Sequence, residues 1–326
     1  MASTRSLALW SGRLAVATAA AVAVLGGCRD RDEITRETDR TCPQTQALST
    51  TRYRGDTLPP KTLALTFDDG PGARTLQLSH WLAARHVPAT FFVNGKMLRG
   101  SSGAAILADI VADGHVLGNH GESHADLTTL DAAAVVGEVT TTDALLAPFI
   151  ADDRFLFRPP YNAFDNATYT ALAASPMAKY VGPIEWDIGD RMSPQSAADW
   201  DCWQPIGTSD PPVLDPESCG DLFLAEIRAK QRGIVLLHDP YFIDDDPAKG
   251  GTVDMVQYIV PILLAEGYTF VAVDEVPAIA AALPPRKPST NGGDAAPPPA
   301  APTGSASSEP IAAPGAPPAS PPPPCR

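Results

Sequence analysis

Two adjacent carboxylates stand directly after a short apolar run in the stretch "TFDDGPG". Asp68 and Asp69 follow the residues Leu63–Phe67, and the chain then turns at Gly70. Like charges side by side are unfavourable unless a cation or hydrogen-bond donors offset their repulsion. A strand that ends in an Asp-Gly turn accounts for the same letters. The two aspartates alone therefore do not establish a catalytic or metal-binding site, and other residues must support one.

That support comes from two histidines spaced four residues apart in "HGESH". On a helix or in a tight turn, this spacing brings His120 and His124 to one face, where they can bind one metal ion. Two exposed or capping histidines are the alternative. A carboxylate from another strand end, Asp68 or Asp69, would complete a three-ligand site with an open position for water. The second carboxylate can then act as base, and His238 in "GIVLLHD" can act as acid.

The elements that must position these residues alternate regularly. Short apolar runs typical of strands are separated by segments with helical periodicity, which predicts a parallel α/β sheet, open or closed. The expected strands are 63–67, 90–93, 115–118, 155–157, 180–186, 234–237 and 269–273. The expected helices are 75–85, 104–112, 131–146, 166–174, 221–230 and 253–265.

Every cluster of ionisable residues falls at the carboxyl end of an expected strand. Active sites of parallel α/β folds form at that edge of the sheet. A longer insertion, 191–220, precedes the sixth strand and carries Cys202 and Cys219, which we expect to form a disulfide in an exported protein. Its tryptophans, Trp200 and Trp203, could stack on sugar rings or pack beneath the insertion.

The N-terminal residues resemble an export signal. Arg5 and Arg13 precede an apolar run over residues 14–27, which is too short for a confident membrane span. The run ends in "LGGC", which resembles the lipobox of bacterial lipoproteins. We therefore predict that residues 1–28 are a signal ending at a lipidated Cys28, which would anchor the exported protein to a membrane of the bacterial cell envelope. An ordinary signal or a short anchor helix is the alternative.

Composition divides the rest of the chain. Residues 29–56 are expected to be a linker, residues 57–282 one domain, and residues 283–326, rich in proline and alanine, a disordered tail. The net charge of −14 argues against a nucleic-acid partner and is compatible with a neutral polymer. Cys42 and Cys325 flank the domain and could pair or stay free, and the oligomeric state is left open.

The motifs "TFDDGPG", "HGESH", "RPPY", "WDIGD" and "IVLLHD", in this order, resemble the polysaccharide deacetylases with a NodB homology domain, carbohydrate esterase family 4. The resemblance covers about residues 60–280. It implies a distorted (β/α) barrel of about seven parallel strands and one divalent metal, often zinc, with cobalt or another ion as alternatives. It also implies removal of acetyl groups from a polysaccharide, either N-acetylglucosamine units of peptidoglycan or a chitin-like glycan, or acetylated xylan. A glycan-binding lipoprotein without catalysis is the alternative from another class.

The resemblance also implies roles for individual residues. Asp68 would be the base, oriented by Arg158, and the metal ligands would be Asp69, His120 and His124. The backbone N–H of Tyr161 would help to hold the oxyanion. Trp186 and Leu236 would form the walls of an acetyl pocket, and His238 would be the acid.

The sequence departs from the family pattern at several positions. Gly121 and Ala125 stand where the family has Ser or Thr and Pro, and Asn162 stands where it has Gly. The fifth-strand motif carries Asp187 and, one position later than usual, Asp190. Which of these two acids partners His238 or Arg158 therefore stays open.

Overall fold

The structure is a computed structural model that describes residues 48–100, 102–191, 193, 196–203 and 213–287. All of these residues lie in one compact unit. Among them, no helix is both long enough and apolar enough to cross a membrane. The predictions for Cys28, Cys42 and Cys325, and for most of the C-terminal tail, fall outside the described residues.

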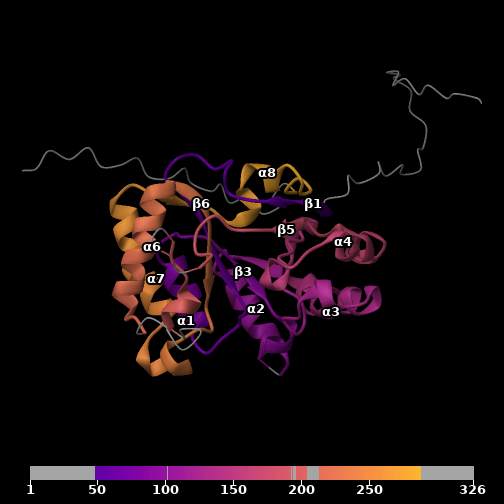
Figure 1. Ribbon diagram of the computed structural model, residues 1–326, viewed down its shortest axis with the longest axis horizontal. Coiled ribbons are helices and arrows are strands. Elements are labelled where there is room, and N and C mark those ends of the chain that lie inside the picture. The colour runs from indigo at the N-terminus through magenta and orange to yellow at the C-terminus, as the bar shows by residue number, and fades with distance from the viewer. Residues whose placement is uncertain (1–47, 101, 192, 194–195, 204–212, 288–326) are drawn as a thin grey trace, which may run out of the picture. The chain divides into compact units, whose positions relative to one another are not determined.

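Parallel strands form the centre of this unit (Figure 1). Strand β2 (Thr62–Asp68) pairs with β3 (Ala89–Val93) on one side and with β6 (Arg232–His238) on the other. Strand β4 (Val116–Asn119) extends the sheet beyond β3. The short strand β7 (Thr269–Phe270) pairs with the first two residues of β2, below the point where β3 begins. The expected strands at these positions are therefore present.

Single bridges close the sheet into a distorted barrel. Strand β5 (Gly182–Ile184) lies on the closing side, between segments that touch β4 and β6. The parallel bridges there join Asn119 with Phe157, Leu156 with Val181, and Ile188 with Val235. The predicted α/β barrel is thus correct, and its closing side is irregular because single bridges replace continuous ladders.

Strand β1 (Leu48–Tyr53) lies in the segment 29–56, which the sequence predicts to be a linker. It pairs in parallel with β5. Its first residue, Leu48, is buried, whereas the residues that follow are polar and largely exposed. Without an apolar alternation, the sequence gives no strand signal here. The correction is that the folded part of the chain extends at least to Leu48.

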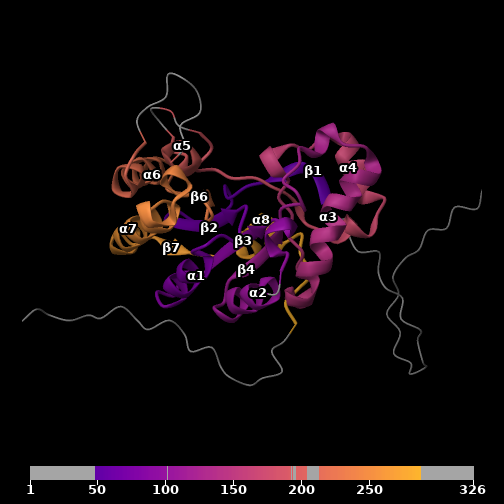
Figure 2. The same cartoon turned by 90° about the horizontal axis from the view of Figure 1, so that it is seen from below.

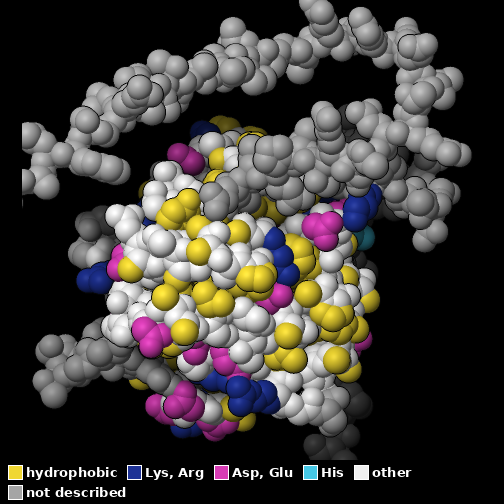
Figure 3. Space-filling model, turned by 90° about the vertical axis from the view of Figure 1, so that its right-hand side faces the viewer, with side chains coloured by type: hydrophobic (Ala, Val, Ile, Leu, Met, Phe, Trp, Pro, Cys, Tyr) yellow, Lys and Arg dark blue, Asp and Glu magenta, His cyan; other side chains and the backbone are white. Residues whose placement is uncertain are grey.

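The helices cover the outside of the barrel (Figure 2). The six expected ones are α1 (Thr75–Ala83), α2 (Gly103–Ala112), α3 (Ala132–Leu146), α4 (Asn166–Ala173), α6 (Pro216–Lys230) and α7 (Thr252–Ala265). Two short helices, α5 (Asp199–Trp203) and α8 (Pro277–Ala280), were not expected. Helices α6 and α7 pack together on one side, and α3 and α4 on the other. In the view of Figure 3, small groups of hydrophobic side chains alternate with charged ones.

Capping residues decide where several helices begin. The carboxylates of Asp131, Asp165 and Asp215 each accept a backbone N–H from the first turn of α3, α4 and α6. Helix α6 therefore starts at Pro216, five residues before the expected position, because the Asp215 cap and a proline in the first turn favour that start. As a result Cys219 lies on α6 rather than in a loop of the insertion.

The strands are buried on both faces, and alternate residues serve different cores. In β2, Leu63, Leu65 and Phe67 pack outward against the covering helices, whereas Ala64 packs inside the barrel. The inner cluster also contains residues of α8 and the segment before it, which fill the bottom of the barrel. The same alternation points Thr66 and Asp68 inward, toward the open upper end. The fold thereby delivers strand-end side chains to one place.

Candidate active site

Asp68 and Asp69 point to different partners because the backbone changes conformation between them. Asp68 is the last residue of β2, and its Oδ1 accepts a hydrogen bond of 2.7 Å from Nη1 of Arg158. Asp69 has a φ of +69°, a left-handed conformation that ends the strand. Its carboxylate turns toward His120 and His124. The two adjacent charges therefore occupy separate sites, each with cationic or donor groups.

Asp69, His120 and His124 form a group that could hold a metal ion, with their ligand atoms within 4.8 Å of one another. Oδ1 of Asp69 lies 3.5 Å from Nε2 of His120 and 3.2 Å from Nε2 of His124. Two ligands at about 2 Å from one tetrahedral zinc ion lie roughly 3.3 Å apart. The three side chains therefore fit a divalent metal, and a set of two histidines and one carboxylate leaves a position open.

Hydrogen bonds orient two of these ligands. Nδ1 of His120 lies 2.8 Å from the carbonyl oxygen of Arg158, so this nitrogen donates and Nε2 keeps its lone pair toward the group. The carboxylate of Asp69 accepts from Nδ2 of Asn94 at 2.9 Å and from the hydroxyl of Tyr241 at 2.7 Å. Such outer partners fix the direction of metal ligands.

The charge states also suit a metal. Burial raises the pKa of Asp69, but the charges of His120, His238 and His124, with the Tyr241 hydrogen bond, outweigh it and lower the pKa to about 2. Burial lowers the pKa of His124 to about 4, against the opposing effect of Asp69. At neutral pH Asp69 is therefore an anion and His124 is neutral, which are the forms that bind metals.

The "HGESH" segment is a tight turn rather than a helix. Gly121 and His124 have φ angles of +74° and +65°. Glu138 of α3 holds the turn, because its carboxylate accepts the backbone N–H groups of Glu122 at 3.0 Å and Ser123 at 2.8 Å and the Ser123 hydroxyl at 2.6 Å. His120 and His124 are thus brought together by a tight turn, which Glu138 of helix α3 stabilises.

Glycines of the first motif allow two loops to touch. A Cβ added at Gly70 would lie 2.3 Å from Oδ1 of Asp239, and one at Gly72 would lie 2.6 Å from Cα of Pro240. The "DGPG" and "HDPY" segments therefore pack directly against each other. Asp239 is fully buried there, and burial raises its pKa to about 7 despite a hydrogen bond from Thr75.

Arg158 lies inside the barrel with no exposed surface. Its Nη1 donates to Oδ1 of Asp68 at 2.7 Å and to the hydroxyl of Thr66 at 2.8 Å, and its Nε donates to the carbonyl of Ile184 at 3.1 Å. The guanidinium also lies 4.3 Å from the ring centroid of Phe92. It therefore holds Asp68 in one orientation and balances its charge.

The structure corrects the expected partner of His238. Nδ1 of His238 lies 2.9 Å from Oδ1 of Asp199, and its backbone N–H donates to Oδ2 of Asp199 at 2.6 Å. Asp187 instead accepts the backbone N–H groups of Gly55 and Ile234, at the opposite end of β6 from His238. Neither expected acid is therefore the partner.

The sequence does not predict Asp199 as the partner of His238, because its position depends on how the insertion folds. Asp190 follows Gly189, whose φ is +95°, and accepts a hydrogen bond of 3.2 Å from the indole of Trp186. The insertion folds back so that α5 places Asp199 against the end of β6. The paired cysteines were the one signal that this segment returns to the barrel.

Asp199 changes the protonation of His238. Burial lowers the pKa of His238, but the charge and hydrogen bond of Asp199, with the charges of Asp69 and Asp68, outweigh it and raise the pKa to about 9. At neutral pH the imidazole is therefore protonated, and its second nitrogen can donate a proton.

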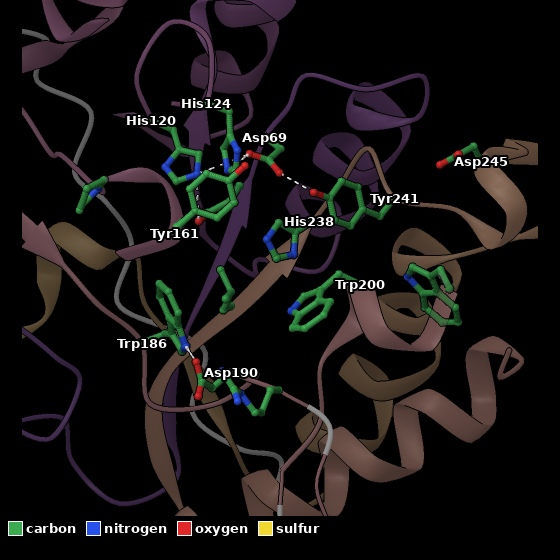
Figure 4. A pocket seen from close by; sticks show the side chains of 15 residues that line it. Asp69, His120, His124, Tyr161, Trp186, Asp190, Trp200, His238, Tyr241 and Asp245 are labelled. Atoms are coloured by element: carbon green, nitrogen blue, oxygen red, sulfur yellow. Dashed lines mark hydrogen bonds and ion pairs between the residues drawn. The ribbon is translucent and has the colours of Figure 1, made fainter. Parts of the chain in front are cut away.

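Asp68, the three possible ligands and His238 line one cavity of about 520 Å³ (Figure 4). The histidines and Asp69 lie together on one side, and Trp186, Asp190 and Trp200 lie across the cavity. The expected wall residues Trp186 and Leu236 both line it. Tyr241 also lines the cavity and was not expected, although it stands three residues after His238 in "HDPY".

The two tryptophans of the insertion differ. Trp200 is partly exposed and lines the cavity. Trp203 also borders the cavity, but it is only 1% exposed and its indole donates to the hydroxyl of Thr252 at 2.9 Å, so it packs beneath the insertion. Next to it, Cys202 of α5 is bonded to Cys219 of α6, with 6.0 Å between their Cα atoms. The disulfide ties the helix that carries Asp199 to the body of the barrel.

Tyr161 and Asn162 form a strained turn at the edge of the cavity, with φ angles of +55° each. Glycine adopts this conformation most readily and asparagine next, which accounts for Asn162 where the family has Gly. Arg52 of β1 donates to Oδ1 of Asn162, and Nδ2 of Asn162 donates to Glu185 at 2.5 Å. The unexpected strand β1 thus braces the turn.

Comparison with known proteins agrees with this geometry. The family model for polysaccharide deacetylase matches residues 55–179. The chitooligosaccharide deacetylase of Rhizobium leguminosarum bv. trifolii is 32% identical over 183 residues, which cover 55% of this chain and 72% of that one. The chain belongs to the polysaccharide deacetylase family. The matched segment of this family member contains Asp68, the three possible ligands and Arg158, whereas Asp199 and His238 lie beyond it.

Two further comparisons show how much of the chain is similar to known deacetylases. The chitin deacetylase of Pestalotiopsis sp is 42% identical over 136 residues, 40% of this chain and 45% of that one. A solved structure described as a T48 deacetylase with substrate has 31% identity and a TM-score of 0.51, covering 67% of this chain and 92% of that one. The chain spans less than half the length of the first curated relatives that it matches.

Proposed function

We propose that this polysaccharide deacetylase family member is a metal-dependent hydrolase that removes acetyl groups from N-acetylglucosamine units of peptidoglycan or a chitin-like glycan. One observation carries the proposal. A three-ligand group, a carboxylate held by a buried arginine, and a histidine held protonated by a buried acid line the same cavity. Amide hydrolysis needs these parts together.

Asp69, His120 and His124 are the proposed ligands, and zinc is the proposed ion, with cobalt as an alternative. When bound, the ion would polarise the acetyl carbonyl and lower the pKa of water. Asp68 is the proposed base. Its Oδ1 is fixed by Arg158, and its Oδ2 lies 3.6 Å from Nε2 of His120, facing the ligand group. This oxygen can therefore accept the proton that water loses as it attacks the carbonyl carbon.

Two further groups act on the substrate. The backbone N–H of Tyr161 is the proposed donor to the oxyanion, since its turn borders the cavity beside His124. His238 is the proposed acid, which gives its proton to the sugar nitrogen as the carbon–nitrogen bond breaks. The products are acetate and a glucosamine unit. Trp186 and Leu236 are the proposed walls around the acetyl methyl group.

The names of the relatives guide the choice of substrate. Two of them are named for chitin or chitooligosaccharides. Acetylated xylan is the second candidate, because a bifunctional xylanase/deacetylase of Pseudobutyrivibrio xylanivorans is 28% identical over 66% of this chain. The proposed cellular setting is the bacterial envelope, with residues 1–28 as signal, Cys28 as lipid anchor, and a C-terminal tail. The tail starts later than the predicted residue 283, because Leu283 is buried in the inner core and Arg286 pairs with Asp274. Cys28→Ala should release the protein from membranes, and an unmodified Cys28 in membrane-bound protein would disprove the anchor.

The decisive test measures acetate release from N-acetylglucosamine oligomers, peptidoglycan and acetylated xylan, with and without added zinc or cobalt. His120→Ala should lose metal and activity together. Asp68→Asn should keep the metal and lose turnover by about 10²-fold or more, since base catalysis typically contributes that much. His86→Ala, at an exposed position outside the cavity, is the control. Metal-bound protein that releases no acetate from any substrate would favour the binding protein without catalysis.

A further inference from the structure

Tyr241 contacts both a proposed metal ligand and the proposed acid. Its hydroxyl donates to Oδ2 of Asp69 at 2.7 Å. Its ring stacks on the imidazole of His238, with centroids 4.7 Å apart and planes within 8° of parallel. Figure 4 shows Tyr241 beside both groups, with its hydroxyl directed at Asp69. The side chain of Tyr241 thus connects the proposed metal-binding group with the proposed acid.

The backbone fixes Tyr241 before any substrate arrives. Its N–H donates to the carbonyl of His238 at 3.2 Å, and its carbonyl accepts from the N–H of Thr252 at 3.2 Å. The preceding residue, Pro240, packs against the backbone at Gly72. The phenol is therefore held at a constant distance from the first motif, so that its hydroxyl can act as a permanent partner of Asp69.

The two oxygens of Asp69 have different surroundings. Oδ1 faces the proposed histidine ligands and also accepts from Asn94. Oδ2 accepts from the hydroxyl of Tyr241. A phenol hydroxyl can donate and an ionised carboxylate can only accept, so the hydroxyl is the donor in this hydrogen bond. Oδ1 is therefore the oxygen of Asp69 that is placed to bind the metal with the two histidines, and Oδ2 is held by Tyr241.

We propose that Tyr241 is a positioning residue with two separable parts. The hydroxyl holds Asp69 so that it binds the metal through Oδ1 alone, and the ring holds the imidazole of His238 in the plane set by Asp199. This inference rests on the proposed function only in requiring that Asp69, His120 and His124 bind a divalent metal. It does not depend on which acetylated glycan is the substrate.

The first test separates the hydroxyl from the ring. Tyr241→Phe keeps the ring and removes the hydroxyl. We expect the dissociation constant for Zn²⁺, measured on metal-free protein by competition with a chromophoric chelator, to rise 10- to 100-fold, the usual effect of losing such a partner. Tyr258→Phe is the matched control, because its hydroxyl also donates to a carboxylate, Asp221 at 2.9 Å, on the surface. It should bind Zn²⁺ as the wild type does.

A spectroscopic measurement tests the mode of binding. In the Co²⁺-loaded protein, Asp69 freed from Tyr241 can bind through both oxygens, which raises the coordination number and weakens the visible absorption bands. We expect weaker bands in Tyr241→Phe and unchanged bands in Tyr258→Phe. Tyr241→Leu, which also removes the ring, should bind Zn²⁺ no better than Tyr241→Phe and should have lower kcat at saturating metal.

The outcomes are distinct. Metal-free Tyr241→Phe should still unfold in one cooperative transition, as the metal-free wild type does, which shows that the variant folds. Equal Zn²⁺ affinity and equal Co²⁺ bands in Tyr241→Phe and wild type would overturn the inference while leaving the proposed function intact. A wild type that binds no Zn²⁺ would overturn both. Zn²⁺ binding without acetate release would contradict only the proposed function.

Discussion

Nδ1 of His238 lies 2.9 Å from Oδ1 of Asp199, a residue 39 positions earlier in the chain. Asp199 is fully buried, and its other oxygen accepts from the His238 backbone at 2.6 Å and from the Thr252 hydroxyl at 2.8 Å. With the backbone N–H of Trp200, which donates to Oδ1 at 2.9 Å, four donors fix this carboxylate. The Asp199–His238 pair depends on the insertion 191–220, because the insertion carries Asp199.

The first prediction concerns the charge of Asp199. Asp199→Asn removes the largest effect that raises the pKa of His238, so the pKa should fall from about 9 as the opposing effect of burial gains weight. Because the acid works in its protonated form, activity on amides should be lost as pH rises through the pKa of His238. The variant should therefore lose activity at lower pH than the wild type. A bound cation, through its own charge, lowers both values.

The measurement is kcat/KM against pH on an N-acetylglucosamine oligomer, together with an NMR titration of His238 in metal-free protein. Asp187→Asn is the control, since Asp187 bonds to backbone groups away from His238. If kcat/KM falls at the same alkaline pH in Asp199→Asn and in the wild type, Asp199 does not determine the pKa of His238.

The second prediction concerns the disulfide that holds α5. Cys202 stands three residues after Asp199 on this five-residue helix, and its bond to Cys219 ties the helix to α6. The bond closes a loop with a sequence separation of 17, which corresponds to about 3 kcal/mol in the chain-entropy treatment. Replacing both cysteines by serine should lower the free energy of unfolding by about that amount. It should also lower the pKa of His238, because Asp199 is held less firmly.

Denaturant unfolding with and without reductant checks this second prediction. Reductant should destabilise the wild type and leave the double serine variant unchanged. Equal stability of wild type with and without reductant, once thiol counting shows the bond to be open, would contradict it.

Much of the site was predictable because parallel strands bring their carboxyl ends together. Asp68 and His238 end the neighbouring strands β2 and β6, and His120 follows β4, which β3 separates from β2. Motifs far apart in the sequence therefore converge at one edge of the sheet without knowledge of the loops. The hydrophobic runs and helical periods likewise gave the order of elements. Strand-end chemistry follows from the alternation of strands and helices alone.

The missed features depend on backbone conformation and loop return, which the sequence pattern does not encode. Asp199 reaches His238 only because the insertion folds back, and Tyr241 reaches Asp69 only through the turn after β6. Strand β1 carries polar residues and so lacks an apolar alternation. Aspartate tolerates the left-handed φ seen at Asp69 better than most residues do, but this preference does not say which of two adjacent aspartates adopts it.

The third prediction concerns the turn that carries the histidines. Glu138→Ala leaves the N–H groups of Glu122 and Ser123 without their carboxylate partner, which should destabilise metal-free protein by about 1–3 kcal/mol. Zn²⁺ affinity should fall as well, because His124 follows directly. Glu138→Gln keeps an acceptor oxygen, so its stability and Zn²⁺ affinity should lie between those of the wild type and Glu138→Ala. Urea unfolding and Zn²⁺ titration measure the two effects, and unchanged values for Glu138→Ala would mean that the turn holds itself.

The last prediction concerns the turn that presents the proposed oxyanion donor. Asn162 has a φ of +55°, a conformation that costs a residue with a Cβ about 1–2 kcal/mol. Asn162→Ala adds that strain and removes the bonds to Arg52 and Glu185, whereas Asn162→Gly removes the bonds but relieves the strain. Donors to an oxyanion act in the transition state, so a displaced Tyr161 N–H should lower kcat more than it raises KM.

We therefore expect kcat to fall in the order wild type, Asn162→Gly, Asn162→Ala, with KM for the oligomer nearly constant. Arg52→Ala removes only the brace from β1 and should resemble Asn162→Gly, whereas Arg85→Ala, at an exposed position on another part of the surface, should match the wild type. Steady-state kinetics on metal-saturated enzyme distinguish these variants. If Arg52→Ala and Asn162→Gly both turn over like the wild type, β1 packs beside the turn without holding it, and the left-handed geometry at Tyr161 and Asn162 is maintained by the barrel alone.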